Sequence, residues 1–113
     1  DVAGVGTARN FLAAATYGTD KAIFGYGNTG SAVSLTNLVN NLGVVAADVT
    51  GVGTARPNLA ASNYGGDKAI FGYGGGYVSM TNLVSNSGVV ATDVTGVGTA
   101  RRFLAAAGYS TSA

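Results

Sequence analysis

Eight consecutive residues of this chain occur twice, and this repetition constrains the fold more than any other feature. The block DKAIFGYG begins at Asp20 and begins again, unchanged, at Asp67, 47 positions later. Repetition of a block at a fixed period of about 20 to 50 residues is the signature of a repeat array. We therefore predict several copies of one structural unit, each burying its apolar side chains against its neighbours.

Other segments recur at the same spacing and define the boundaries of the units. The phrase at Asp1–Arg9 returns at Asp48–Arg56 and at Asp93–Arg101, and only its third residue differs between the copies. We expect one repeat domain, part of a larger array, over residues 1–113. Its parts are a partial outer strand and connection at 1–9, a first unit at 10–56, a second unit at 57–101, and the inner strand of a partial unit at 102–113.

Short apolar segments separated by Gly-rich turns predict strands within each unit. Ala22–Tyr26 is a β-branched and aromatic run that alternation would place with Ala22, Phe24 and Tyr26 on one face. The Gly and Asp of Tyr17–Asp20 suit a hairpin turn. The segment at Val33–Val39 also satisfies helical spacing. Its flanking Gly and Asn residues favour a strand.

The number of segments per unit indicates a fold class. With a further strand around Val44, Val45 and Val49, each unit of 45 to 47 residues holds four strands. Four strands in about 40 to 50 residues is typical of one blade of a β-propeller. We therefore predict an all-β, propeller-type array of four-stranded antiparallel blades, with a stacked β-array as the alternative. The Ala-rich segments fit the innermost strands, and the residues expected between blades are Ile23, Phe24, Leu38 and Val44.

One order of residues resembles a known repeat family. Arg9, two intervening residues, Leu12–Ala14, a Gly turn and Lys21–Gly27 follow the order of the kelch repeat. Kelch units usually carry a Gly-Gly pair and a later Trp, whereas the glycines here are separated by Tyr26 and Trp is absent. The near-identical copies are also similar to repeats of phage tails, other virion proteins and microbial surface proteins. This resemblance implies a β-propeller fold and no enzymatic activity.

Composition argues against several functional classes. Histidine and cysteine are absent, which removes the commonest general base and metal ligand together with all thiolate chemistry. The net charge is +1 and the six basic residues are not clustered, so we expect no nucleic-acid partner. No apolar run approaches the roughly 20 residues of a membrane span. The chain does not begin with Met, and we expect a processed or excerpted chain in an extracellular or virion location.

Two glycine motifs suggest nucleotide binding, but we interpret the first as a turn and the second as a connection between blades. Gly25–Gly30 matches G-x-G-x-x-G, but no helix is expected after it and the second copy breaks the pattern at Gly75–Tyr77. Gly4–Arg9 lacks the Lys-Ser/Thr of a phosphate-binding loop. We predict no cofactor, metal or catalytic residue. Structural roles in turns and between blades are expected for Arg9, Arg56, Arg101, Asp20 and Asp67.

The candidate ligand-binding residues are aromatic and amide side chains near the length-variable loop. They are Tyr26, Asn28, Tyr73 and Tyr77, because an accessible aromatic ring beside an amide is a common way to hold a sugar. The two units differ in length between Asn28–Ala32 and Gly75–Tyr77, which marks this loop as the place to look for function.

Two functions fit these features. The first is a non-enzymatic structural or assembly module of a virion or cell-surface appendage, and the alternative is a glycan-binding propeller. A propeller ring needs about four to eight blades, so we expect either a homo-oligomer or further repeats of a longer chain.

Overall fold

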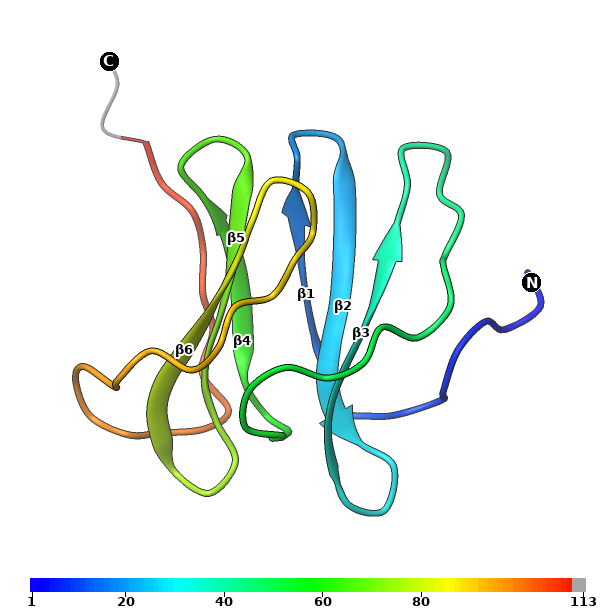
Figure 1. The fold of residues 1–113 in the computed structure, drawn as a ribbon. Helices are drawn as coiled ribbons and strands as arrows, with labels where there is room; N and C mark the ends of the chain where they lie inside the picture. Colours follow the sequence, from blue (N-terminus) through cyan, green and yellow to red (C-terminus); the bar gives the residue numbers. More distant parts are fainter. Residues whose placement is uncertain (111–113) are drawn as a thin grey trace.

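The computed structural model describes residues 1–110 and shows six β-strands and no helix within them (Figure 1). The strands form two three-stranded antiparallel sheets, with orders β1-β2-β3 and β4-β5-β6. Their bounds are β1 (Ala13–Tyr17), β2 (Lys21–Asn28), β3 (Ala32–Val39), β4 (Ala60–Tyr64), β5 (Lys68–Gly74) and β6 (Val78–Val84). The all-β prediction is confirmed. The end of the predicted terminal strand, residues 111–113, lies outside the described residues.

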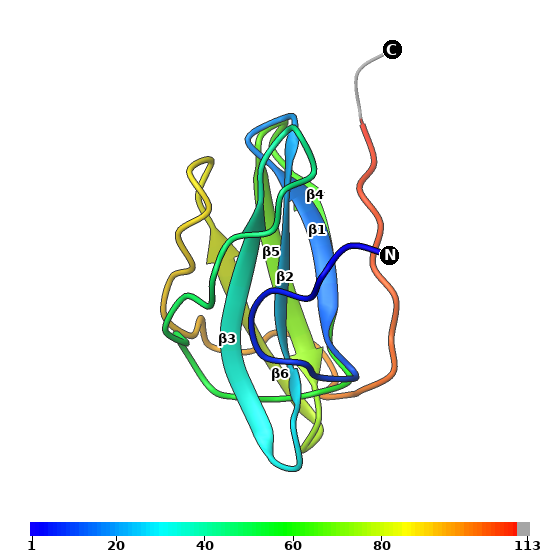
Figure 2. The same cartoon turned by 90° about the vertical axis from the view of Figure 1, so that its right-hand side faces the viewer.

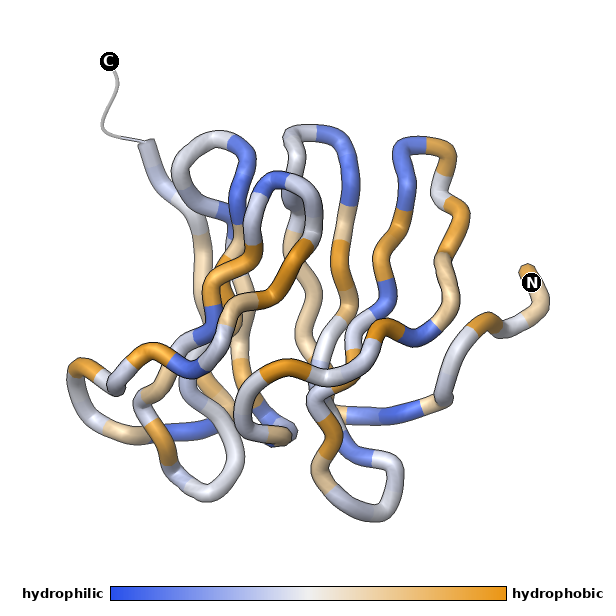
Figure 3. Tube along the Cα trace, in the orientation of Figure 1, coloured by the Kyte–Doolittle hydropathy of each residue, from blue (hydrophilic) through white to orange (hydrophobic). Residues whose placement is uncertain are grey.

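Tight hairpins connect the strands within each sheet. The β1–β2 turn follows Tyr17, which pairs with Lys21, and Gly18 and Thr19 both have positive φ. Glycine adopts that conformation without strain, so the prediction of a hairpin here is confirmed. Figure 3 shows hydrophilic residues at the turns of this hairpin and its copy, while apolar residues run along the strands.

The ambiguous third segment is a strand. Residues of β3 pair with β2 in antiparallel register, for example Leu38 with Ile23 and Asn37 with Phe24. The helical interpretation of its spacing is therefore wrong. Leu35, Leu38 and Val39 fit a helical period only because apolar residues occupy both faces of this strand, and Leu42 lies beyond its end.

The fourth segment of each unit is irregular rather than a regular strand. In the first unit it bonds to β3 through isolated bridges between Val39 and Val45 and between Thr36 and Val49. The bridges are three residues apart on β3 and four apart on the segment, so one extra residue interrupts the ladder. The second unit has the same arrangement at Val84–Val90 and Thr81–Val94. Each sheet thus has three regular strands and a bonded edge segment, where we predicted four strands.

An irregularity in the β2–β3 pairing reverses the predicted orientation of one aromatic residue. The β2–β3 register shifts between Gly25 and Gly27, and Tyr26 has φ of 64°. The extra residue lies on β3, between Val33 and Thr36, and on β2 the positive φ of Tyr26 interrupts the alternation. Tyr26 therefore packs against Phe71 of the second sheet, while Phe24 is 39% exposed. The prediction that Phe24 and Tyr26 share a face is wrong for this reason.

The two sheets lie side by side, and β1 contacts β4 and β5 (Figures 1 and 2). The core between them consists of Tyr17, Ile23, Tyr26, Leu59, Ala69, Phe71, Val84 and Val90. Ile23 is buried as predicted, and Leu38 packs against the core. Phe24 and Val44 are exposed, at 39% and 59%, so their predicted place between sheets is wrong in the first unit. In the second unit the bonded segment turns Val90 inward and leaves Val89 exposed.

The two end segments lie on opposite sides of this pair of sheets. The N-terminal segment runs beside the first sheet, on the side away from the second (Figures 1 and 2). Residues 102–110 run beside β4 on the far side of the second sheet and belong to no strand. A backbone bond from Phe103 N to Asn58 O, 3.0 Å long, holds the start of this segment.

Candidate functional site

The recurring arginine and tyrosine residues gather where one unit meets the next. The Arg56 side chain is 1% exposed and lies over the ring of Tyr26 at 4.8 Å from its centre. Its Nε donates to the carbonyl of Tyr73, and its Nη1 donates to Thr54 O at 2.9 Å. Arg56 therefore joins an aromatic ring of the first unit to a backbone carbonyl of the second.

The same contacts recur before and after this position. Arg9 Nε donates to Tyr26 O at 2.8 Å, and the Arg101 guanidinium lies 4.3 Å from the centre of the Tyr73 ring. Arginine and tyrosine consequently alternate along the series Arg9, Tyr26, Arg56, Tyr73, Arg101. A cation over an aromatic face contributes about 0.5 to 2 kcal/mol, more when both groups are desolvated.

Burial shifts the pKa values of two groups of this series, Tyr26 and Arg56, but both stay protonated. Desolvation raises the pKa of the Tyr26 hydroxyl, which stays protonated and donates to Val52 O at 2.9 Å. Desolvation also lowers the pKa of the Arg56 guanidinium, and the Coulomb attraction of the Asp93 carboxylate opposes this effect. Arginine keeps its charge in proteins, so Arg56 remains a cation fixed between two units.

A second recurring contact links the repeated phrase to the sheet that follows it. Asp48 accepts hydrogen bonds from Thr7 N at 3.1 Å, from Thr7 Oγ1 at 2.6 Å and from Asn37 Nδ2 at 2.9 Å. These bonds, led by that of the Thr7 hydroxyl, lower the pKa of the Asp48 carboxyl. The second unit repeats the arrangement with Asp93, Thr54 and Asn82.

The glycine before each threonine is required by this contact. A Cβ at Gly6 would lie 2.5 Å from Asp48 Oδ1, and Gly6 has φ of 80°. Gly53 is in the same situation beside Asp93. Only glycine combines the positive φ with the close approach, which explains why the phrase repeats Val-Gly-Thr.

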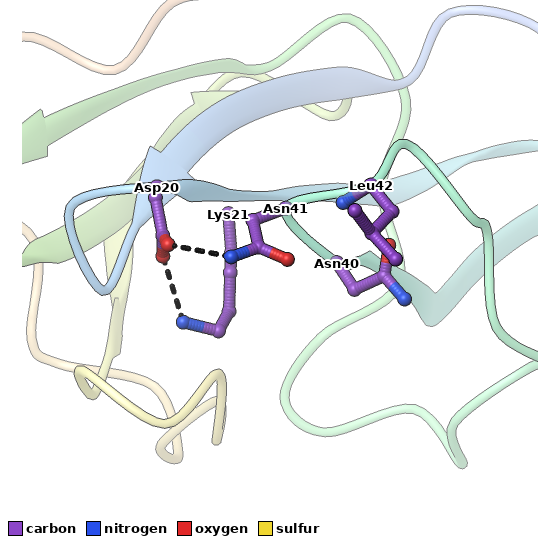
Figure 4. A network of polar contacts seen from close by, with 5 residues as sticks. All are labelled: Asp20, Lys21, Asn40, Asn41 and Leu42. Carbon is purple, nitrogen blue, oxygen red and sulfur yellow. Dashed lines mark hydrogen bonds and ion pairs between the residues drawn. The ribbon is translucent and has the colours of Figure 1, made fainter.

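The turn aspartates connect two neighbouring turns of each unit. Asp20 accepts hydrogen bonds from Lys21 Nζ at 2.8 Å and from Asn41 Nδ2 at 3.0 Å, as Figure 4 shows. Both bonds lower the pKa of the Asp20 carboxyl, that of Lys21 more strongly. Asp67 makes the equivalent bonds to Lys68 and Asn86. In Figure 4 the backbone N of Leu42 faces the side chain of Asn40, whose Oδ1 accepts its hydrogen bond at 2.9 Å and shapes the same turn.

The four predicted ligand-binding residues do not form one site. Tyr26 is fully buried, and the Oδ1 of Asn28 accepts a bond from Gly30 N at 2.6 Å within its own turn. Tyr73 lies under Arg101 and donates its hydroxyl proton to Val97 O. Tyr77 is 59% exposed, with Arg102 4.5 Å from its ring centre. Among the four, Tyr77 offers the most accessible ring.

Sequence reasoning named the arginines of this junction but missed part of its polar contacts. No contact among Thr7, Asn37 and Asp48, or among their copies, was predicted. The available signal was the identity of the whole repeated phrase. Asp and Thr occupy the same positions in every copy of the phrase, and the Thr of one copy donates to the Asp of the next.

Neither a metal cluster nor a membrane-spanning helix is found in the part of the chain that the structure describes. Within residues 1–110, no group of three or more His, Cys, Asp or Glu residues could hold a metal ion. No helix in that range is long and apolar enough to cross a membrane. Comparison of the whole chain with protein-family models and with curated protein sequences finds no match. The kelch resemblance therefore stays a prediction that depends on the residues quoted for it.

Proposed function

We propose that this chain is a non-enzymatic structural module whose repeated units build an assembly of a virion or cell-surface appendage. The observation that carries the proposal is the use of its recurring polar side chains. Arg56 joins Tyr26 of one unit to Tyr73 of the next, and Asp93 holds Thr54 of the connecting phrase. These residues are repeated because each new unit must be held to the one before it.

For the finer architecture we propose a propeller-type array in which each sheet with its edge segment is one blade. Three features support this. The sheets pack side by side through β1, β4 and β5, the β1–β2 and β4–β5 turns lie at the same end, and an edge segment bonds to the third strand of each sheet. The kelch-like place of the arginines at the unit boundary agrees with the proposal.

The chemistry of the carboxylates favours a structural role over a catalytic one. Asp48 and Asp93 each accept bonds from a threonine backbone N–H, a threonine hydroxyl and an asparagine amide. Those bonds lower the pKa of both carboxyls, so neither group is suited to carrying a proton near neutral pH.

For the location of the assembly we propose a virion or an extracellular surface. A surface polarity supplied by Ser, Thr, Asn and Gly, with only 10% charged residues, supports that location.

The assembly role is tested by the mass of the purified chain in solution. We expect sedimentation velocity over a range of micromolar concentrations to show oligomers that grow with concentration. A stable monomer throughout that range would contradict the assembly function.

A glycan-binding role is the alternative, favoured by the exposed ring of Tyr77 beside Arg102. An aromatic face next to a hydrogen-bond donor suits a sugar ring. Binding on a glycan array that is lost in Tyr77→Ala, and retained in a Tyr109→Ala control, would support it. Tyr109 is a suitable control because its side chain is 90% exposed elsewhere on the chain. Equal binding by the two variants would exclude the Tyr77 site.

A further inference from the structure

Each sheet presents two different faces, and the two sheets carry the same residues on them. We call the side that bears the tyrosine with positive φ the Tyr face and the opposite side the Phe face. The Tyr face comprises Ile23, Gly25, Tyr26 and Leu38 in the first sheet, and Ile70, Gly72, Tyr73 and Leu83 in the second. The Phe face comprises Ala22, Phe24, Val39 and Val45 in the first sheet, and Ala69, Phe71, Val84 and Val90 in the second.

Inside the chain, the Tyr face of the first sheet is covered by the Phe face of the second. The ring of Phe71 lies 5.0 Å from that of Tyr26, centre to centre, and is fully buried. A Cβ at Gly25 would lie 2.6 Å from Phe71 Cζ. The absence of a side chain at Gly25 thus makes the space that Phe71 fills.

The other two faces are complementary, and only the irregular end segments of the chain lie against them. On the Phe face of the first sheet, Phe24 is 39% exposed where its copy Phe71 is 0% exposed. On the Tyr face of the second sheet, a Cβ at Gly72 would approach only Thr81 Cγ2, at 3.3 Å. A hollow lies there, lined by Ala60, Ile70, Gly72, Tyr73, Thr81 and Leu104 among others.

We propose that a second copy of this chain docks head to tail on this hollow. The Phe face of its first sheet would cover the Tyr face of the second sheet, with Phe24 of the incoming copy beside Gly72. The proposal rests on the assembly function proposed above and names its interface. The internal junction shows which residues fit, because the block at 20–27 and the block at 67–74 are identical. Two different faces meeting in this way generate a ring or an open stack.

The connecting phrases must exchange for the new junction to copy the internal one. In the accepting copy, residues 102–109 belong to no strand and occupy the side where the incoming β1 would pack. In the incoming copy, Thr7 of the first phrase already donates to the Asp48 carboxylate, which also accepts a hydrogen bond from Asn37. We infer that residues 102–109 leave and that Asp93–Arg101 replaces Asp1–Arg9. Thr99 then donates to Asp48 of the incoming copy, as Thr54 donates to Asp93 within the chain.

The test uses two single variants of the full chain and their mixture. Phe24→Ala removes the inserted side chain, and Gly72→Ala fills the hollow. We expect each variant alone to sediment as a monomer at concentrations where the unchanged chain associates. The loss of a buried phenylalanine should weaken association about a hundredfold or more, and the added Cβ about tenfold or more.

The mixture distinguishes head-to-tail docking from contact between like faces. Chains with Phe24→Ala keep an intact Tyr face, and chains with Gly72→Ala keep an intact Phe face. An equimolar mixture should therefore form a one-to-one dimer and nothing larger. If the mixture stays monomeric while each chain alone is folded by circular dichroism, the proposed interface is wrong.

The remaining outcomes separate this interface from the assembly function. If the unchanged chain and both variants associate equally well, the assembly function is supported and the proposed interface is contradicted. If the unchanged chain is monomeric, the assembly function itself is contradicted. The phrase exchange has its own measurement: Thr99→Val should weaken association while leaving the melting temperature of the monomer unchanged. Unaltered association of that variant would overturn the exchange.

Discussion

The first and second sheets contain the same central strand sequence, KAIFGYG, and place it in different surroundings. Phe71 is fully buried while Phe24 is 39% exposed, and Tyr26 is fully buried while Tyr73 is only partly buried. The difference comes from the neighbour on each side and not from the strand itself. In a repeat array, stability resides in the junctions between units, so equivalent substitutions in the two sheets should have unequal effects.

The largest contrast is expected between Phe71→Ala and Phe24→Ala. Removing the buried Phe71 ring should lower the free energy of unfolding by about 3 to 5 kcal/mol. The same change at exposed Phe24 should lower it by less than about 1 kcal/mol. Urea denaturation of dilute monomer measures both values. Similar losses at the two positions would show that the sheets do not depend on each other.

Arginine substitutions should give the next contrast. Arg56→Met removes charge-assisted hydrogen bonds and a cation–π contact at a buried site, and should cost about 2 to 4 kcal/mol. Arg9→Met should cost less, because Arg9 is only partly buried and its guanidinium lies over no aromatic ring of residues 1–110. Arg56→Lys keeps the charge but loses the planar fork, so it should restore only part of the loss. Full restoration by lysine would mean that charge alone suffices.

The glycines of the Tyr faces provide a subtler comparison. Gly25→Ala forces a Cβ against Phe71 and should lower the free energy of unfolding by about 1 to 3 kcal/mol. Gly72→Ala meets only Thr81 Cγ2, at 3.3 Å, so a small shift of that side chain accommodates it and the free energy of unfolding should change by less than about 1 kcal/mol. Thermal melting of the two variants at equal concentration checks the order. A loss at Gly72 equal to that at Gly25 would contradict the assignment of an open hollow.

The smallest expected effect is the loss of stability at low pH. The pKa values of Asp48 and Asp93 are lowered in the folded chain, chiefly by the threonine hydroxyl bonds. The contribution of each is therefore complete above the unfolded pKa of about 4 and is lost as pH falls through the folded pKa. We expect the urea concentration at the unfolding midpoint to decrease as the pH is lowered below about 4. Asp93→Asn should be less stable than the unchanged chain at pH 7, and the two should converge at low pH. A constant difference at all pH values would exclude this linkage.

Much of the fold followed from the sequence because local chemistry determines it. The repeat period is visible in the sequence itself, and both the hairpin at Tyr17–Asp20 and the strand character of the third segment depend on residues close together in the chain. The fourth segment was located, but its extra residue between Val45 and Val49 prevents a regular ladder. The alternation of apolar and polar residues does not reveal a single unpaired residue in a strand.

The orientation of Tyr26 and the unequal burial of the two phenylalanines needed the structure. Glycines on both sides of Tyr26 were a usable signal of a bulge, since Gly inside a strand pattern often marks one. No local signal could distinguish Phe24 from Phe71, because their neighbours in sequence are the same. Likewise the choice of Asp48 as the partner of Thr7, 41 residues away, depends on how the units pack.

The β2–β3 hairpin shows how these units tolerate a change in length. Gly27 pairs with Val33 and its copy Gly74 pairs with Val78, and the first unit adds one further pair, Asn28 with Ala32. The two-residue difference between units is thus one rung of a ladder, which leaves every side chain on its original face. The β2–β3 hairpin can therefore be lengthened in steps of two residues to carry an inserted peptide. An odd number of inserted residues would move the side chains beyond the insertion to the opposite face of the sheet.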